Sequence, residues 1–119
     1  MRLMHLGLPV RDVRRSRRFY ETYFGFDPAT VQEYEDGTTI IRDVGGFDLA
    51  LHGGQEVGAL PEFLHFGFRL SGPEAVRELL ARVEAGGAEI IERYDTPAHV
   101  SFKCADPDGH RVEAYWEPG

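Results

Sequence analysis

An internal repeat constrains the fold of this chain more than any other feature of its sequence. The segment His5–Val10 reads His-apolar-Gly-apolar-x-apolar, and His65–Leu70 has the same pattern 60 positions later. Self-similarity over tens of residues indicates that one supersecondary unit occurs twice. We therefore predict two modules of one kind, 1–56 and 57–119, which together make a single domain of 119 residues.

Each copy of the motif is followed by a helical pattern and then by three short strand-like stretches. The first helix is expected after Asp12, a good N-cap, and should end at Gly25. The second should begin near Pro73 and end at Gly86 and Gly87. The strand-like stretches are 29–35, 38–44, 47–53, 88–95, 99–105 and 110–116, separated by turn residues. This order predicts an α+β fold of two β-α-β-β-β modules.

The predicted strands each have one apolar face. In the first strand Leu6 and Leu8 alternate with His5 and Gly7, and alternate side chains point to opposite faces. The apolar stripes of the helices can be buried only against that apolar face of the strands. We therefore expect the helices to pack on the outside of a curved mixed sheet. Glycines at matched strand positions indicate either the close approach of a ligand or easier strand curvature. The concave face then carries His5, His65 and Glu113 beside Gly7, Gly67 and Ala50.

His5, His65 and Glu113 are candidate ligands of a metal ion. Two imidazoles and one carboxylate form a facial triad, which leaves coordination positions of an octahedral divalent ion open. Open positions are typical of catalytic metal sites, because substrate or water can bind there. The repeat aligns Ala50 with Glu113, so the fourth related position has no ligand. The alternative interpretation is that the histidines are hydrogen-bonded strand residues without a metal.

Composition and charge exclude several classes of partner. The chain has 13 Lys and Arg against 20 Asp and Glu, a net charge of −7, which disfavours nucleic acid as a partner. The basic cluster from Arg11 to Arg18 has helical spacing and is expected to be a solvated helix face. No apolar run approaches the roughly 20 residues that span a membrane, and no signal peptide is evident. A single cysteine, Cys104, excludes disulfides and CxxC motifs and should be inert, so we expect a cytoplasmic protein.

Taken together, these motifs resemble the vicinal oxygen chelate superfamily over nearly the whole chain. The superfamily includes glyoxalase I, fosfomycin-resistance transferases, extradiol dioxygenases, methylmalonyl-CoA epimerase and bleomycin-binding proteins. The resemblance implies a cup around one divalent ion held by His5, His65 and Glu113. It also implies a homodimer with shared sites, in which one chain supplies His5 and the other His65 and Glu113. The stretches that carry it are 5–12, 16–20, 25–26 and 106–113.

Three positions depart from particular members of that superfamily. Ala50 stands where glyoxalase I and the epimerase keep a fourth protein ligand. Gly7 and Lys103 stand where the fosfomycin transferases have a threonine and a tyrosine. These three activities are therefore disfavoured, whereas extradiol dioxygenases use the same two-histidine, one-glutamate set on Fe(II). Bleomycin-binding relatives lack the triad, so its presence favours a metal-dependent protein.

We therefore predict a divalent-metal-dependent enzyme of the glyoxalase or dioxygenase type. Its small substrate would chelate the ion through adjacent oxygens, and the ion, which could be Fe, Mn, Zn, Ni or Co, would act as a Lewis acid. Candidate proton carriers are His52, His99 and Tyr115. Candidate contacts to an anionic substrate are Arg69, Lys103 and Arg111.

A second function is left open by the aromatic residues. A protein of the bleomycin-resistance type could bind a drug or metabolite without catalysis, with the histidines merely hydrogen-bonded. Substitution of the three candidate ligands separates the two functions, since only metal-dependent binding needs them. The aromatic residues that suggest this function are Phe47, Phe63, Phe102, Tyr115 and Trp116.

Overall fold

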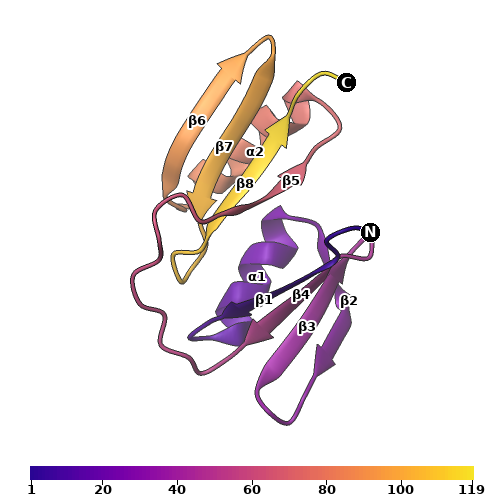
Figure 1. The fold of residues 1–119 in the computed structure, drawn as a ribbon, viewed down its shortest axis with the longest axis vertical. Helices are drawn as coiled ribbons and strands as arrows, with labels where there is room; N and C mark the ends of the chain where they lie inside the picture. The colour runs from indigo at the N-terminus through magenta and orange to yellow at the C-terminus, as the bar shows by residue number, and fades with distance from the viewer. The chain divides into compact units, whose positions relative to one another are not determined.

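The computed structural model describes all residues, Met1–Gly119, and divides them into two compact units (Figure 1). The units are Met1–Ala59 and Leu60–Gly119. Each contains a strand, a helix and three further strands in that order, so the predicted α+β fold of two β-α-β-β-β modules is confirmed. Neither helix is long and apolar enough to cross a membrane.

The first unit is a four-stranded mixed sheet with one helix. Its strand order is β1-β4-β3-β2, with β1 parallel to β4 and the other neighbours antiparallel. Strands β1 and β4 can be parallel because α1 follows β1 in the chain. The helix carries the chain back along the sheet before β2, β3 and β4 are added. The elements are β1 (His5–Pro9), α1 (Val13–Tyr23), β2 (Phe26–Glu33), β3 (Thr38–Asp43) and β4 (Asp48–His52).

Helix α1 begins and ends at the residues that the sequence indicates. The Asp12 carboxylate accepts hydrogen bonds from the backbone N–H groups of Arg14 and Arg15, at 3.0 and 3.3 Å. Gly25, just beyond the helix, has a φ of +73°, a conformation that glycine adopts without strain. Strand β2 then starts at Phe26, so the predicted start at residue 29 was wrong. Phe26 is buried and its ring contacts Tyr20, which extends the strand back to the helix end.

The core of the first unit lies between α1 and one face of its sheet. Leu8 and Leu49 are buried on that face, as the alternation predicted. On the helix the buried positions are Ser16, Phe19 and Tyr20, spaced i, i+3 and i+4. Val13 and Tyr23, the first and last residues of the helix, are only half-buried.

The second unit repeats this arrangement. Its strand order is β5-β8-β7-β6, with β5 parallel to β8, and α2 lies behind β7 and β8 (Figure 1). Gly72 is the N-cap of α2, Pro73 is in its first turn, and Gly87 beyond its end has a φ of +86°. The elements are β5 (Phe66–Arg69), α2 (Pro73–Ala85), β6 (Ile90–Thr96), β7 (His99–Ala105) and β8 (Arg111–Trp116).

The core of the second unit is formed by α2 and the apolar face of β7 and β8. Phe102 is completely buried there, between α2 and the sheet, next to Cys104 and Val112. Phe102 therefore cannot supply surface for a ligand, and its assignment to an aromatic binding surface was wrong. Its strand parity places it opposite to Lys103 and Ser101, which point to the other face.

The ladder registers of the two units confirm the alignment of the repeats. In the first unit Gly7 pairs with Ala50, and in the second Gly67 pairs with Glu113. Both pairs join the first strand of a unit to its last strand. Ala50 and Glu113 are thus structurally equivalent positions, and only the second unit has a carboxylate there.

Candidate functional site

Two of the three predicted metal ligands meet on the sheet face of the second unit that points away from α2. His65 comes directly before β5, and Glu113 lies in the middle of β8. The Nε2 atom of His65 is 3.8 Å from Oε1 of Glu113. That separation is shorter than two metal–ligand bonds of about 2.1 Å placed end to end, so one ion can bond to both atoms.

The imidazole of His65 is held in the form that can bind a metal. Its Nδ1 lies 2.7 Å from the backbone carbonyl oxygen of Phe63. A carbonyl oxygen only accepts hydrogen bonds, so Nδ1 carries the hydrogen and donates it. In the neutral imidazole, Nε2, which faces Glu113, then has a free lone pair. A backbone carbonyl that fixes the tautomer in this way is a usual second partner of metal-binding histidines.

Gly67 leaves the space that the Glu113 side chain occupies. A Cβ atom added at Gly67 would lie 3.2 Å from the Cβ of Glu113 and 3.3 Å from its Oε1. Both contacts are closer than ordinary van der Waals distances. The glycine therefore leaves room for the neighbouring carboxylate, and the predicted close approach of a ligand stays a prediction.

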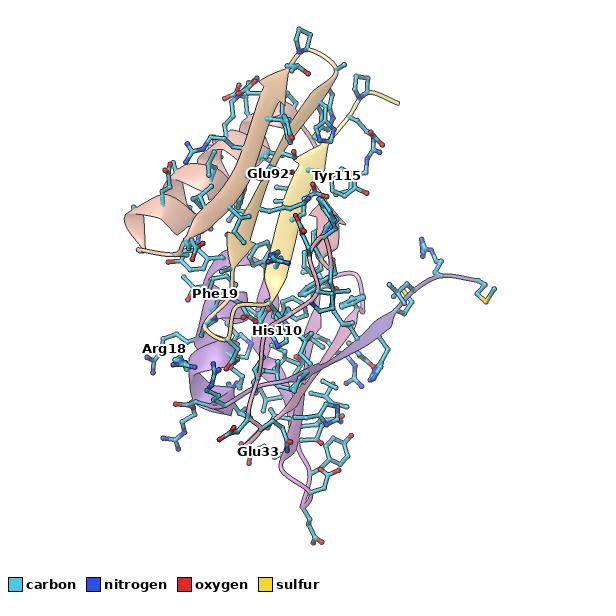
Figure 2. All side chains as sticks on the ribbon, turned by 60° about the vertical axis from the view of Figure 1, so that its left-hand side comes forward. Arg18, Phe19, Glu33, Glu92, His110 and Tyr115 are labelled. Carbon is cyan, nitrogen blue, oxygen red and sulfur yellow. The ribbon has the colours of Figure 1, made fainter.

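Lys103 and Glu92 continue the polar row from Glu113 across the sheet. Lys103 pairs with Glu113 in the β7–β8 ladder, and Glu92 pairs with Lys103 in the β6–β7 ladder. The ammonium of Lys103 is 3.2 Å from Oε1 of Glu92, and its side chain is only 14% exposed. The three strands thus place one cation between two carboxylates, of which Glu92 is labelled in Figure 2.

The candidate proton carriers of the second unit lie at different distances from this pair. Tyr115 follows Glu113 by two residues on β8 and shares its face, so it is one side-chain position away (Figure 2). His99 instead contacts Glu117 and Ser101, with its Nε2 2.9 Å from the Ser101 hydroxyl oxygen. Ser101 pairs with Tyr115 in the β7–β8 ladder, and Glu117 follows Glu113 by four residues. A role of Tyr115 or His99 in proton transfer stays a prediction.

The two arginines predicted to hold an anionic substrate bind backbone carbonyls of their own unit. A guanidinium nitrogen of Arg69 donates to the carbonyl of Glu117 at 2.6 Å, and Arg111 donates to the carbonyl of Pro61 at 2.9 Å. These bonds order the C-terminal segment and the loop before β5. A role of Arg69, Lys103 or Arg111 in substrate binding stays a prediction.

The third predicted ligand, His5, belongs to the first unit. Its Nδ1 is 3.8 Å from Oδ2 of Asp48, and its side chain is 58% exposed. Asp48 also accepts a hydrogen bond from Arg42. No group of three or more His, Cys, Asp and Glu side chains comes together within the single chain. That His5 joins His65 and Glu113 therefore stays a prediction.

His52 is part of a chain of polar groups that the sequence analysis missed. Its Nδ1 lies 2.9 Å from the hydroxyl oxygen of Thr38, its partner in the β3–β4 ladder. Hydrogen bonds from the side chain and backbone of Thr38 hold the pKa of Asp36 below its usual value. The Nε2 of His52 lies over β1, 3.1 Å from where a Cβ of Gly7 would be. The sequence could have indicated this contact, because Thr38 and His52 lie opposite each other in the predicted pair of neighbouring strands.

Cys104 takes no part in such chemistry. It is fully buried, and burial raises the pKa of its thiol to about 12. A neutral thiol is a poor nucleophile and a poor metal ligand. The predicted burial of this strand cysteine is confirmed.

A family model described as the Glyoxalase/Bleomycin resistance protein/Dioxygenase superfamily matches residues 2–114. The chain belongs to this superfamily. The resemblance inferred from the His-apolar-Gly motif and from the 106–113 stretch is therefore confirmed. The match covers both units, so each is half of the superfamily domain.

Curated relatives of this superfamily domain have different activities. The chain is 32% identical to an uncharacterized protein of Pseudomonas aeruginosa, over 98% of this chain and 89% of that one. It is 28% identical to a probable trivalent organoarsenical cleaving enzyme of Bacillus subtilis, over 98% and 80%. It is 30% identical to a 3-methylcatechol 2,3-dioxygenase of Pseudomonas putida, over 97% of this chain but only 39% of the dioxygenase. Relatives of this chain therefore include enzymes.

Solved structures of the superfamily have the same fold. A possible glyoxalase from Bacillus cereus superimposes with a TM-score of 0.79 at 30% identity, covering 96% of this chain and 97% of that one. A mutant of the fosfomycin resistance protein FosX from Listeria monocytogenes superimposes with a TM-score of 0.78 at 20% identity, covering 94% and 86%. That FosX structure contains Mn(II) and a dihydroxypropylphosphonic acid. The FosX likeness shows the fold alone.

Proposed function

We propose that this protein is a divalent-metal-dependent enzyme whose ion is held by His5, His65 and Glu113. The observation that supports this most directly is the arrangement of His65 and Glu113. Their Nε2 and Oε1 atoms face each other at 3.8 Å, and the carbonyl of Phe63 leaves the Nε2 lone pair free. The donor set of nitrogen and carboxylate oxygen suits Mn, Fe, Co, Ni and Zn.

The substrate in this proposal is a small molecule that offers two adjacent oxygens. When bound, the ion supplies Lewis-acid stabilisation of negative charge that develops on a substrate oxygen. Three protein ligands leave open positions for such a chelating substrate. Lys103, which pairs with Glu113 in the ladder and whose ammonium contacts Glu92, adds positive charge on the same sheet face. It would favour a substrate that carries an anionic group.

Among the candidate proton carriers, the proposal favours His52, because its ring is oriented by hydrogen-bonded neighbours within the first unit. Its Nδ1 is held by the Thr38 hydroxyl, and Thr38 in turn bonds to Asp36. If the Thr38 oxygen accepts from Nδ1, then Nε2 is the basic nitrogen and can take a proton from a substrate. The anionic Asp36 favours this polarity. His99 also bonds to a hydroxyl, that of Ser101, but through Nε2.

The binding-only alternative has less support. Of the aromatic residues that suggested it, Phe102 is in the core and the Phe47 ring packs against Phe26. Phe63 is exposed, and its backbone carbonyl accepts the hydrogen bond from His65. The metal-dependent proposal also accounts for the facing Nε2 and Oε1 atoms of His65 and Glu113, which stacking of an aromatic ligand does not need.

Metal titration of the protein tests the proposal. We expect chelator-treated wild-type protein to bind roughly one Mn(II) per chain in a calorimetric titration. His65→Ala and Glu113→Gln should each abolish this binding. His99→Ala is the matched control, since it removes an imidazole from the same sheet face that bonds to Ser101 instead, and it should bind like wild type. Equal binding by all variants, or no binding by wild type, would contradict the proposal.

Turnover is the second part of the same test. Metal-loaded protein is incubated with a trivalent organoarsenical and with 3-methylcatechol, the substrates that the names of two relatives give. We expect turnover of at least one of them, lost in Glu113→Gln and reduced in His52→Gln. If metal binds but Glu113→Gln retains full turnover, the assignment of the catalytic ion is wrong.

A further inference from the structure

Phe63 has a backbone conformation that is costly for its residue type. Its φ is +68°, and it is the only non-glycine residue of the chain with a positive φ. The left-handed region brings a Cβ close to the neighbouring carbonyl, so bulky residues avoid it and glycine usually replaces them there. A non-glycine residue in this region persists only where its surroundings impose it, and such positions cluster at functional sites.

The side chain of Phe63 does not explain the conformation. The residue is 77% exposed, and the following Leu64 is 56% exposed. Neither side chain therefore gains enough burial to hold the turn in place. The reason for the conformation must lie in the backbone groups that it orients.

The backbone of this turn makes two contacts with the predicted site. The carbonyl of Phe63 accepts the hydrogen bond from Nδ1 of His65 at 2.7 Å. Two residues earlier, the carbonyl of Pro61 accepts from the N–H of Leu64 at 3.3 Å and from the guanidinium of Arg111 at 2.9 Å. Arg111 lies on β8 two residues before Glu113, so it ties the turn to the strand that carries the carboxylate.

We propose that Phe63 and Arg111 are positioning residues for His65. The left-handed turn at Phe63 holds His65 as the Nδ1–H tautomer with Nε2 toward Glu113, and Arg111 holds the turn by binding Pro61. An unrestrained neutral imidazole exchanges its proton between both nitrogens and rotates about its side-chain bonds. The turn removes both freedoms before any ion binds. The inference rests on the proposed function only for the consequence for metal binding, since the tautomer is a property of the metal-free protein.

Nitrogen NMR of the metal-free protein tests the tautomer directly. In wild type, recorded above the pH at which histidines titrate, His65 should show a protonated Nδ1 and an unprotonated Nε2. Phe63→Gly should leave this signature unchanged and raise the melting temperature, because glycine adopts a positive φ without strain. Phe63→Pro fixes φ near −65° and should give a mixture of tautomers. Should the proline variant not fold, Phe63→Val serves instead, since a β-branched residue also resists the left-handed region.

Arg111→Met tests the second positioning residue. It should broaden or mix the His65 tautomer signals while the amide spectrum shows a folded protein. Arg93→Met is the matched control, because it removes an arginine that pairs with Glu84 on the other side of the sheet. We expect no change at His65 in that variant. The affinity for Mn(II) should fall about 10- to 100-fold in Phe63→Pro and Arg111→Met, the usual effect of removing a partner of a metal-binding histidine.

The outcomes separate this inference from the proposed function. A wild-type His65 that is protonated on Nε2, or a folded Phe63→Pro variant with an unchanged tautomer, would overturn the inference. A wild-type protein with the expected tautomer that binds no Mn(II) would refute the proposed metal site and leave the role of Phe63 in ordering His65 intact.

Discussion

At the scale of single residues, the site depends on contacts that residue types alone do not reveal. His65 and Glu113 could be selected from the sequence because their positions in the repeat and their strand parity place them on one face. The turn at Phe63 could not, since the usual sequence signal for a positive φ is glycine or asparagine. Thr38 was missed for a similar reason, because a hydroxyl gains importance only from the histidine opposite it.

Gly67 affects both the packing of the second unit and the candidate site, because it lies against the side chain of Glu113. In Gly67→Ala the new methyl group would meet Glu113 at 3.2 to 3.3 Å, so the carboxylate must move. We expect a loss of about 1 to 3 kcal/mol in the free energy of unfolding, measured by urea denaturation, as for other overpacked positions. The affinity for Mn(II) should fall as well.

Gly58→Ala is the control for that substitution, because a Cβ at Gly58 meets no atom within 4 Å. Its stability and metal affinity should match wild type. A Gly67→Ala protein as stable as the Gly58→Ala protein would show that Glu113 has room to spare.

Cys104 makes stability sensitive to alkaline pH. Its thiol has a pKa of about 12 in the folded protein against 9.0 for an ordinary cysteine. The unfolded chain therefore loses a proton more readily, and stability that is present below pH 9 declines as the pH rises toward 12. Cys104→Ala should be less stable at neutral pH, since it leaves a small cavity, but should lose less of its stability between pH 8 and pH 10. Urea denaturation across this range measures both effects, and parallel pH curves would contradict the explanation.

At the scale of elements, the sequence predicted where the helices end and which strand residues alternate. It predicted less well where the strands start and which residues are buried in the core. Asp12 and Gly25 bound α1 as expected, because capping depends on local residues. The start of β2 was misplaced since it depends on Phe26 reaching the core. Phe102 was assigned to the wrong surface although its alternation with Lys103 was available, because an aromatic residue suits both a core and a binding face.

The two helices differ in their N-caps, which gives an element-scale prediction. Asp12 caps α1 with its carboxylate, whereas Gly72 caps α2 without a side-chain hydrogen bond. Asp12→Ala should lower the free energy of unfolding by about 1 kcal/mol, and Gly72→Asp should raise it by a few tenths of a kcal/mol. Thermal denaturation of both variants measures the effects. The Gly72 position can accept a Cβ, since nothing lies within 4 Å of it and its φ is −170°.

At the scale of the whole molecule, the repeat predicted two modules, and the structure describes each of them as a compact unit with its own sheet and helix. The predicted ligands are divided between these units, His5 in the first and His65 with Glu113 in the second. Under the proposed function, the three ligands would come together only when two chains associate. The proposed homodimer with shared sites supplies His5 from one chain and the other two ligands from its partner.

Mixing two inactive variants tests this sharing. A His5→Ala chain and a Glu113→Gln chain are each expected to lack intact sites alone. After subunit exchange, about half of the dimers are mixed, and each mixed dimer has one intact and one doubly defective site, so about a quarter of the sites recover. Mn(II) binding measures the recovery. No recovery, in a mixture shown by mass spectrometry to contain mixed dimers, would contradict sharing.

The equivalent ladder positions of Ala50 and Glu113 have a consequence for any attempt to make the two halves alike. An acid introduced at Ala50 would enter a fully packed position, 2% exposed, beside the ring of His52 that already lies over Gly7. The first half thus keeps room for an imidazole, and the second half keeps room for an acid. The two repeats have therefore become specialised for different side chains, and an Ala50→Glu substitution made to restore their symmetry would displace the His52 ring.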